Sequence, residues 1–178
     1  MLTTHEYPIL EFDDNKIAKL NPTHFAGNGL STNKLIITFF PEVIEKLKEE
    51  GKIFLERTIG GENPIQMYQF ADSDVLITLG VVGCPSCAGN LDLFNAMGVN
   101  KVMFCGGGGV LDKNIEVGQI LVVDGAIRDE GLSYHYIPAS RYIETNKNVN
   151  KVLEDALLMH HQQYVTGRTW TIDALYRE

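Results

Sequence analysis

The stretch DVLITLGVVGCPSCAGNLDLFNAMGVNKVMFCGGGG, residues 74–109, decides the fold. It reads as an apolar strand, a loop with glycines, a helix that ends in glycine, a second apolar strand and four consecutive glycines. Buried strands separated by helices are typical of α/β proteins whose sheet is covered on both faces. Glycine loses more backbone entropy on folding than any other residue, so four in a row at a strand end require a reason.

The same alternation of strands and helices continues on both sides of this stretch. Strands are predicted at 34–40, 52–59, 65–70, 74–83, 100–105 and 119–127 and from 164 onward, and helices at 41–51, 86–98 and 146–162. Residues 1–33 are polar with weak periodicity and are expected to be irregular. We therefore expect one α/β domain over residues 1–178, with three α/β/α layers around a central mixed sheet.

Composition narrows the classes of function that this chain can serve. The 178 residues include 15 Lys and Arg against 23 Asp and Glu, a formal charge of −8, which disfavours a general nucleic-acid-binding role. No apolar run is long enough for a membrane span, and the N-terminus does not read as a secretory signal. Three cysteines do not make a disulfide framework, so a reduced, cytoplasmic setting is expected.

Three unusual loops follow apolar strands, and ligands of open α/β sheets collect at such strand ends. These loops are GVVGCPSC, CGGGGVLD and AIRDEGLSYHY. In the second loop, backbone N–H groups of Gly106, Gly107, Gly108 and Gly109 are expected to approach a ligand closely. No Gly-Lys-Ser/Thr follows them, so this is not a phosphate loop of the Walker type.

The CPSC segment at 84–87 leaves three interpretations open. Cys84 and Cys87 between a strand and a helix are the pattern of a thiol redox site. Zinc would need about four ligands, and the chain has no second Cys-x-x-Cys pair, so we expect no metal. We also expect no organic cofactor. The third interpretation is a turn with Pro85 and a helix-capping Ser86.

Taken in order, these motifs resemble the middle of the nucleoside phosphorylase superfamily, which includes purine nucleoside and uridine phosphorylases. The family's Gly-x-Gly-x-Pro-Ser loop is matched, in altered spacing, by Gly80, Gly83, Pro85 and Ser86. Its Gly-Ser/Thr-x-Gly loop is matched by residues 106–109, and its Val-Gly-Asp strand by VGQILVV at 117–123. AIRDEGLSYHYIP and the closing GRTWTIDALYRE extend the resemblance from about Lys34 to the last residue.

The resemblance implies a pentosyltransferase that uses phosphate to cleave the N-glycosidic bond of a nucleoside, giving free base and sugar 1-phosphate. It also implies a homo-oligomer that binds a nucleoside or base and, where the site allows, inorganic phosphate, with no membrane or nucleic acid as partner. Two positions depart from the family: Phe104 replaces an arginine that grips phosphate, and Gly107 replaces a Ser or Thr. The family also continues beyond the last residue into ribose-binding and proton-donating segments, so a truncated homologue with impaired catalysis is expected.

The alternative is a non-catalytic nucleoside-binding, base-binding or assembly protein on the same scaffold. Arg57 resembles an arginine that the family lends to a neighbouring subunit's phosphate site, although a solvated strand residue is the simpler interpretation. Arg128 is a candidate substrate contact or a partner for Asp129 or Glu130. The remaining candidates are either pocket-lining or structural, and they are Ser133, His135, Tyr136, Trp170, Tyr176 and, near the N-terminus, His5.

Overall fold

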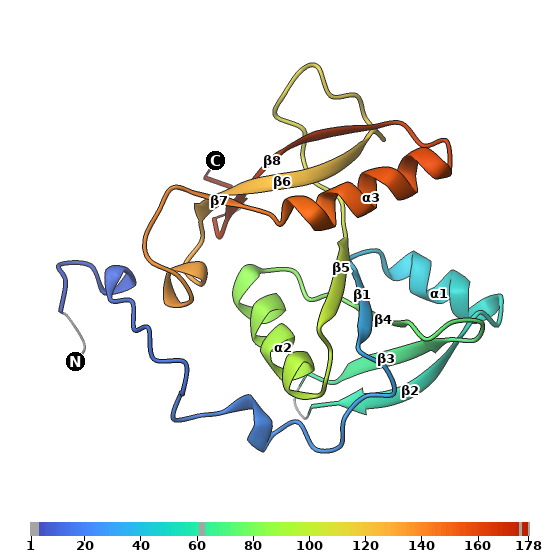
Figure 1. The fold of residues 1–178 in the computed structure, drawn as a ribbon, viewed down its shortest axis with the longest axis horizontal. Helices are drawn as coiled ribbons and strands as arrows, with labels where there is room; N and C mark the ends of the chain where they lie inside the picture. The colour runs from blue at the N-terminus through green and yellow to red at the C-terminus, as the bar shows by residue number, and fades with distance from the viewer. Residues whose placement is uncertain (1–3, 61–62, 175, 178) are drawn as a thin grey trace. The chain divides into compact units, whose positions relative to one another are not determined.

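The computed structural model describes residues 4–60, 63–174 and 176–177, which form two compact units (Figure 1). The five-stranded unit is Lys16–Gly108, and the three-stranded unit combines Met1–Asn15 with Gly109–Glu178. The five-stranded unit contains η2 (Pro22–His24), β1 (Lys34–Thr38), α1 (Pro41–Glu49), β2 (Ile53–Ile59), β3 (Ile65–Phe70), β4 (Leu76–Leu79), α2 (Cys84–Ala96) and β5 (Lys101–Cys105). The three-stranded unit contains η1 (Pro8–Leu10), β6 (Ile120–Asp129), η3 (Ser133–His135), β7 (Tyr142–Glu144), α3 (Lys147–Met159) and β8 (Tyr164–Ile172).

The sheet of the five-stranded unit is mixed, in the order β2-β3-β4-β1-β5. β1 runs parallel to both β4 and β5, whereas β2, β3 and β4 are antiparallel neighbours. Because parallel strands end at the same edge, the loops that follow β4 and β5 leave the same edge of the sheet, one on each side of β1. The loops that begin at Gly80 and Gly106 thus share one sheet edge, whereas the third loop of the sequence analysis, which begins at Arg128, belongs to the other sheet.

Two apolar clusters cover the opposite faces of this sheet. Phe94 and Met97 pack with one cluster, which includes Leu35 and Leu76, paired residues of β1 and β4. Ile44 of α1 packs with the other cluster, which includes Ile77 of β4. Neighbouring residues of a strand point to opposite faces, so Leu76 and Ile77 place α2 on one face and α1 on the other (Figure 1). The three α/β/α layers predicted from the sequence are therefore present in this unit.

The sheet of the three-stranded unit has the order β7-β6-β8, with β6 antiparallel to β7 and parallel to β8. The predicted strands thus divide between two sheets, and β7 adds a short strand that the sequence did not reveal. Among the described residues of this unit, Val122 is the one large apolar side chain that is buried, and Arg128 and Glu130 are buried polar residues. Hydrogen bonds between polar groups therefore have to supply much of the stability that apolar packing supplies in the five-stranded unit.

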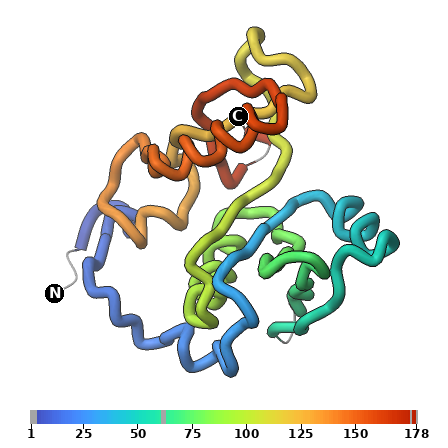
Figure 2. The backbone as a smooth tube through the Cα atoms, turned by 45° about the vertical axis from the view of Figure 1, so that its right-hand side comes forward, coloured from blue at the N-terminus to red at the C-terminus, as the bar shows by residue number. Residues whose placement is uncertain are grey.

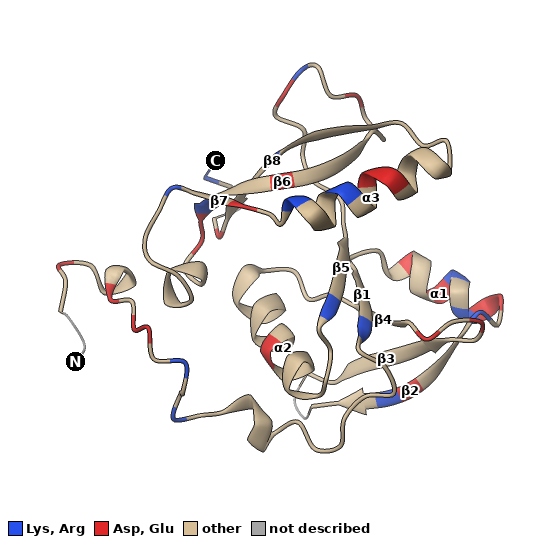
Figure 3. Ribbon diagram, viewed as in Figure 1, with Lys and Arg blue, Asp and Glu red and all other residues tan. Residues whose placement is uncertain are grey.

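The N-terminal segment belongs to the three-stranded unit, although residues 16–108 separate it in sequence from the rest of that unit. η1 contacts η3 within this unit, and Figure 2 shows the two segments side by side. Charged side chains are spread over both units (Figure 3). Over residues 4–60, 63–174 and 176–177, no helix combines the length and apolar character needed to cross a bilayer.

The helix boundaries correct one detail of the sequence analysis. α2 begins at Cys84, its N-cap is Gly83, and no side chain caps it, so the prediction that Ser86 caps this helix is wrong. Pro85 lies in the first turn, where its missing N–H costs nothing and its fixed φ suits the helix. The segment between the strands predicted at 52–59 and 65–70, which the sequence GGENP predicts to be a turn, includes residues 61–62, which lie outside the described residues.

The helices α1, α2 and α3 end in the same hydrogen-bonding pattern. After α1, Gly51 has φ 66°, and after α2, Gly98 has φ 104°. After α3 the equivalent residue is His161, with φ 56°. There the N–H of His161 donates to Leu158 and the N–H of Gln162 to Leu157, which is the Schellman arrangement. A side chain with a Cβ therefore occupies a left-handed conformation that glycine adopts more easily.

Candidate functional site

The glycines at the edge of the five-stranded sheet divide into two kinds. A Cβ on Gly80 would stand 2.7 Å from Cε1 of Phe39 and 2.9 Å from Cγ2 of Ile37. A Cβ on Gly106 would stand 3.1 Å from Cδ2 of the same Phe39 ring. The ring of Phe39 thus lies against both loops, and glycine at these two positions is a packing requirement.

The later glycines of the second loop have a different environment. A Cβ on Gly107 would make only ordinary contact with the Phe40 ring, and one on Gly108 or Gly109 would meet nothing within 4 Å. All three are exposed, and among the described residues their backbone N–H groups donate no hydrogen bond. Three donors that face solvent are what a ligand-binding loop offers, so the proposal of ligand-facing backbone is kept for these positions.

The phosphate-site candidates of the five-stranded unit have structural or exposed environments among the described residues. Arg57 donates from Nη1 to the carbonyl of Asn28 over 2.6 Å and from Nη2 to that of Gly29 over 3.2 Å. Its guanidinium therefore ties the segment before β1 to β2. Phe104, where the family has an arginine, is 48% exposed on the outer strand β5.

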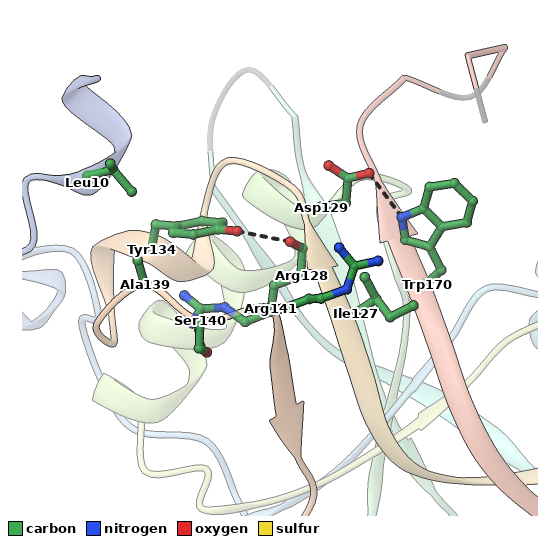
Figure 4. A pocket seen from close by; sticks show the side chains of 9 residues that line it. All are labelled: Leu10, Ile127, Arg128, Asp129, Tyr134, Ala139, Ser140, Arg141 and Trp170. Atoms are coloured by element: carbon green, nitrogen blue, oxygen red, sulfur yellow. Dashed lines mark hydrogen bonds between the residues drawn. The ribbon is translucent and has the colours of Figure 1, made fainter. Parts of the chain in front are cut away.

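A cavity of about 600 Å³ lies in the three-stranded unit (Figure 4). Figure 4 shows Tyr134 and Trp170 on opposite sides of it. It is lined by residues of η1, β6, β8 and the 130–141 segment, namely Leu10, Ile127, Arg128, Asp129, Tyr134, Ala139, Ser140, Arg141 and Trp170. A mixed apolar and polar lining with two aromatic walls is typical of small-molecule sites.

The buried Arg128 organises the loop that borders this cavity. Its Nε donates to Oγ of Ser133 over 2.8 Å, and its Nη1 donates to Oγ of Ser140 over 2.7 Å and to the carbonyl of Pro138 over 2.8 Å. The Tyr134 ring lies 4.4 Å from the guanidinium carbon. The side chain is 5% exposed, and these bonds satisfy a cation that would otherwise be costly to bury.

Glu130 completes the same network from the other side of Ser133. Its carboxylate accepts hydrogen bonds from the backbone N–H groups of Leu132 and Ser133, over 2.8 and 2.9 Å, and from the Ser133 hydroxyl. Ser133 therefore connects Arg128 and Glu130 through its hydroxyl. The structure thus shows the Arg128 side chain hydrogen-bonded to the 130–141 segment. The sequence had left open whether this side chain contacts a substrate or pairs with an acidic residue.

Trp170 forms the opposite wall of the cavity and is fixed by a hydrogen bond. Its indole Nε1 donates to Oδ2 of Asp129 over 3.0 Å. Trp170 pairs with Ile127 across β8 and β6, and Ile127 pairs with Tyr142 of β7, so the three side chains share one face of the sheet. The indole is 38% exposed, which leaves part of its ring available to a planar ligand.

The structure brings together some of the predicted site residues and separates others from the cavity. Arg128 and Trp170 line it, and Ser133 supports it through Arg128. His135 and Tyr136 are exposed and do not line it, and Tyr176 is 92% exposed. The lining residues outside the sequence motifs were not predicted: Ala139, Ser140 and Arg141 directly follow the AIRDEGLSYHYIP segment, and Leu10 carried no signal.

The burial of the cysteine thiols in the five-stranded unit bears on whether they can act in redox chemistry. All three cysteines are free, and burial raises the pKa of the Cys87 and Cys105 thiols. A raised pKa opposes the low-pKa thiolate that a redox-active cysteine needs. Among the described residues, no group of three or more His, Cys, Asp or Glu side chains is placed to hold a metal ion.

The layers, the strand-end glycine loops and the cavity together define an α/β protein of the nucleoside phosphorylase type. The model of the Phosphorylase superfamily matches residues 34–178, and the chain belongs to this family. A guanosine phosphorylase of Halorubrum lacusprofundi is 36% identical over 64 residues. That match covers 36% of this chain and 27% of the relative, so it spans about a quarter of the curated protein's length.

Two solved structures show the same fold at low sequence identity. A uridine phosphorylase from Vibrio fischeri superposes with a TM-score of 0.71 at 17% identity, covering 91% of this chain and 69% of that one. Helicobacter pylori MTAN superposes with a TM-score of 0.64 at 20% identity, covering 83% and 70%. The α/β phosphorylase-like fold predicted from the sequence is thereby confirmed.

Proposed function

We propose that this protein binds a nucleoside or its free base in the cavity of the three-stranded unit. The observation that carries the proposal is the Trp170 indole, which Asp129 holds at the wall of a cavity of about 600 Å³. An aromatic ring fixed in this way offers a stacking surface to a flat base at low entropic cost. The Tyr134 ring on the other side and the polar groups between the two rings supply shape and orientation (Figure 4).

We further propose that phosphate-dependent cleavage of the N-glycosidic bond is weak in this chain. The family reaction requires phosphate beside the anomeric carbon, and charge-assisted contacts hold it there. Phe104 and Gly107 remove an arginine and a hydroxyl from the positions that the resemblance assigns to phosphate. Hydrogen bonds to charged groups contribute about 1.5–3 kcal/mol each, and about 1.4 kcal/mol corresponds to a factor of ten in rate.

The other candidate residues also have proposed roles. The exposed N–H groups of Gly107, Gly108 and Gly109 are proposed donors to an oxyanion, with Gly106 shaping the loop. Arg57 is a proposed phosphate contact for a second copy of the chain, which requires the homo-oligomer that the family resemblance implies. In the three-stranded unit, Ser133, Tyr136 and Tyr176 are proposed to contribute to substrate binding.

A non-catalytic binding or assembly protein on this scaffold is the second candidate function. The exposed Phe104 side chain favours it, because an aromatic ring at this position supplies no charge for phosphate. A non-catalytic binding protein would differ from the first candidate in turnover alone, whereas an assembly protein would also lack nucleoside binding.

Two measurements test the proposal. Release of free base from inosine, guanosine, adenosine and uridine, followed by chromatography with and without phosphate, is expected to be slow. Turnover at typical enzyme rates of about 1–1000 per second would overturn the impaired-catalysis part. In calorimetry, Trp170→Ala should weaken nucleoside binding by about 1–3 kcal/mol, the range for loss of one base–aromatic stack. Trp170→Phe keeps a ring and should retain most of the affinity; equal losses for both variants would contradict a stacking role.

A further inference from the structure

The helix α3 has an apolar side that its sheet leaves exposed. Asn150, Leu153 and Leu157 are half-buried, and Nδ2 of Asn150 donates to the Val123 carbonyl of β6 over 3.0 Å, so this side of the helix faces the sheet. Next to it around the helix lies a second row of apolar side chains, which we call the α3 seam and which consists of Val149, Val152, Ala156 and Met159. All four are exposed, and in the three larger ones more than half of the residue is open to solvent.

The α3 seam has the spacing of a coiled-coil contact. Its members follow one another after three, four and three residues, as the a and d positions of successive heptads do. Side chains with this spacing form a row along one face of a helix and interdigitate with a second helix. A surface helix that has no partner on its outer side usually carries polar and charged residues there. The apolar seam therefore indicates that another helix packs against α3.

The charges of α3 stand in the reverse of the order that its own dipole favours. Lys147 and Lys151 lie in the first half of the helix, and Glu154 and Asp155 lie in the second half (Figure 3). A helix dipole favours acids near the N-terminus and cations near the C-terminus. The helix α1 follows this rule, with an acid in its first turn and two lysines in its last turn. The charge order of α3 thus points to a neighbour that compensates for it.

We propose that the α3 seam binds the α3 seam of a second copy of this chain, with the two helices antiparallel. An antiparallel partner brings the lysine-bearing half of each helix to the acid-bearing half of the other, whereas a parallel partner would oppose like charges. The seam is also self-complementary, because where Val149 faces Met159 of the second copy, Val152 faces Ala156, a larger side chain against a smaller one. This inference does not depend on the proposed function. A seam of four side chains makes a small interface, so the dimer should dissociate on dilution.

Cross-linking of the full chain tests the antiparallel register. The thiols introduced by Val149→Cys and Met159→Cys lie about 15 Å apart along one helix, which is too far for a disulfide within the chain. In the proposed dimer, position 149 of each copy meets position 159 of the other. The double variant should therefore form a covalent dimer under mild oxidation with copper phenanthroline, and neither single variant should. Peptide mapping distinguishes this bond, because the three native cysteines all lie in the five-stranded unit.

Analytical ultracentrifugation over a series of protein concentrations measures the association without cross-links. Val152→Glu should weaken it about tenfold or more, because the variant buries a charge in the seam. Leu158→Glu is the matched control, since Leu158 is similarly exposed on α3 but lies about 180° around the helix from Val149. It should change the association less than about threefold. Circular dichroism verifies that both variants keep the helix.

Charge exchange separates the contact between copies from an ion pair within one helix. Nζ of Lys151 lies 2.6 Å from Oδ1 of Asp155 in the same chain. Lys151→Glu and Asp155→Lys each replace this ion pair by two like charges, and each variant alone should remain monomeric. An equimolar mixture of the two variants should associate, because each copy then offers the other opposite charges. Mixing cannot restore an ion pair within a helix, so recovery has to come from contact between copies.

Three results would overturn the inference. The first is a wild type that stays monomeric at every concentration, and the second is an association that Val152→Glu leaves unchanged, which would place the contact on another surface. The third is a covalent dimer of the single variant Val149→Cys, which would indicate parallel helices. A monomer whose melting temperature falls on Val152→Glu but not on Leu158→Glu would show that the seam is covered within one chain, and would overturn the inference as well.

Discussion

Arg128 and Tyr134 make two different contacts with each other. The guanidinium carbon lies 4.4 Å from the centre of the Tyr134 ring, and the Tyr134 hydroxyl donates back to the Arg128 carbonyl over 3.0 Å. The 128–134 turn is thereby closed by the side chains at its two ends. Because Val122 is the one buried large apolar side chain found among the described residues of this unit, the polar closure has a large share in its stability.

Arg128→Met should lower the free energy of unfolding by about 2–4 kcal/mol, because it removes the hydrogen bonds of a buried guanidinium to Ser133, Pro138 and Ser140 and the link through Ser133 to the buried Glu130. Urea denaturation followed by Trp170 fluorescence measures the change within the same unit. Arg168→Met is the control, and its exposed side chain should cost less than about 0.5 kcal/mol. Equal losses of unfolding free energy for the two variants would show that the hydrogen bonds of Arg128 contribute no more to stability than an exposed arginine does.

Replacement of Gly80 tests the packing at the edge of the five-stranded sheet. Gly80→Ala places a Cβ 2.7 Å from the Phe39 ring, and overpacking of this kind costs about 1–3 kcal/mol. Gly108→Ala meets nothing within 4 Å and should be neutral or slightly stabilising. Thermal unfolding by circular dichroism compares the two. A smaller cost of Gly80→Ala in a Phe39→Leu background would identify the ring as the cause, and an unchanged cost would not.

His161→Gly should stabilise the protein by about 0.5–1 kcal/mol, because glycine adopts the left-handed conformation after α3 without a Cβ penalty. Gly98→Ala, at the equivalent position after α2, is the mirror experiment and should destabilise. Guanidinium denaturation curves give both changes. Destabilisation by His161→Gly would mean that the imidazole makes a contribution larger than the backbone strain.

The sequence predicted the parts of the fold that local patterns determine. Apolar runs located the strands, and Gly51 and Gly98 marked two helix ends, because glycine is favoured where φ is positive. The division into two sheets was not predictable, because strand pairing depends on distant segments. Arg141 was missed for the same reason: its place in the cavity depends on the register of Tyr142, Ile127 and Trp170, which no local pattern encodes.

The thiols of Cys87 and Cys105 provide the last prediction. Burial raises their pKa values above that of an ordinary thiol, so at pH 8 each carries a smaller thiolate fraction than a free cysteine. Iodoacetamide labelling of both, followed by mass spectrometry, should be slower than that of glutathione at pH 8 and should keep rising with pH after glutathione has levelled off. Insulin reduction should be absent from the wild type and unchanged in Cys84→Ser and Cys87→Ser, with thioredoxin as the positive control. Fast labelling of Cys87 at pH 7, together with insulin reduction that either substitution abolishes, would establish a thiol redox site at the start of α2.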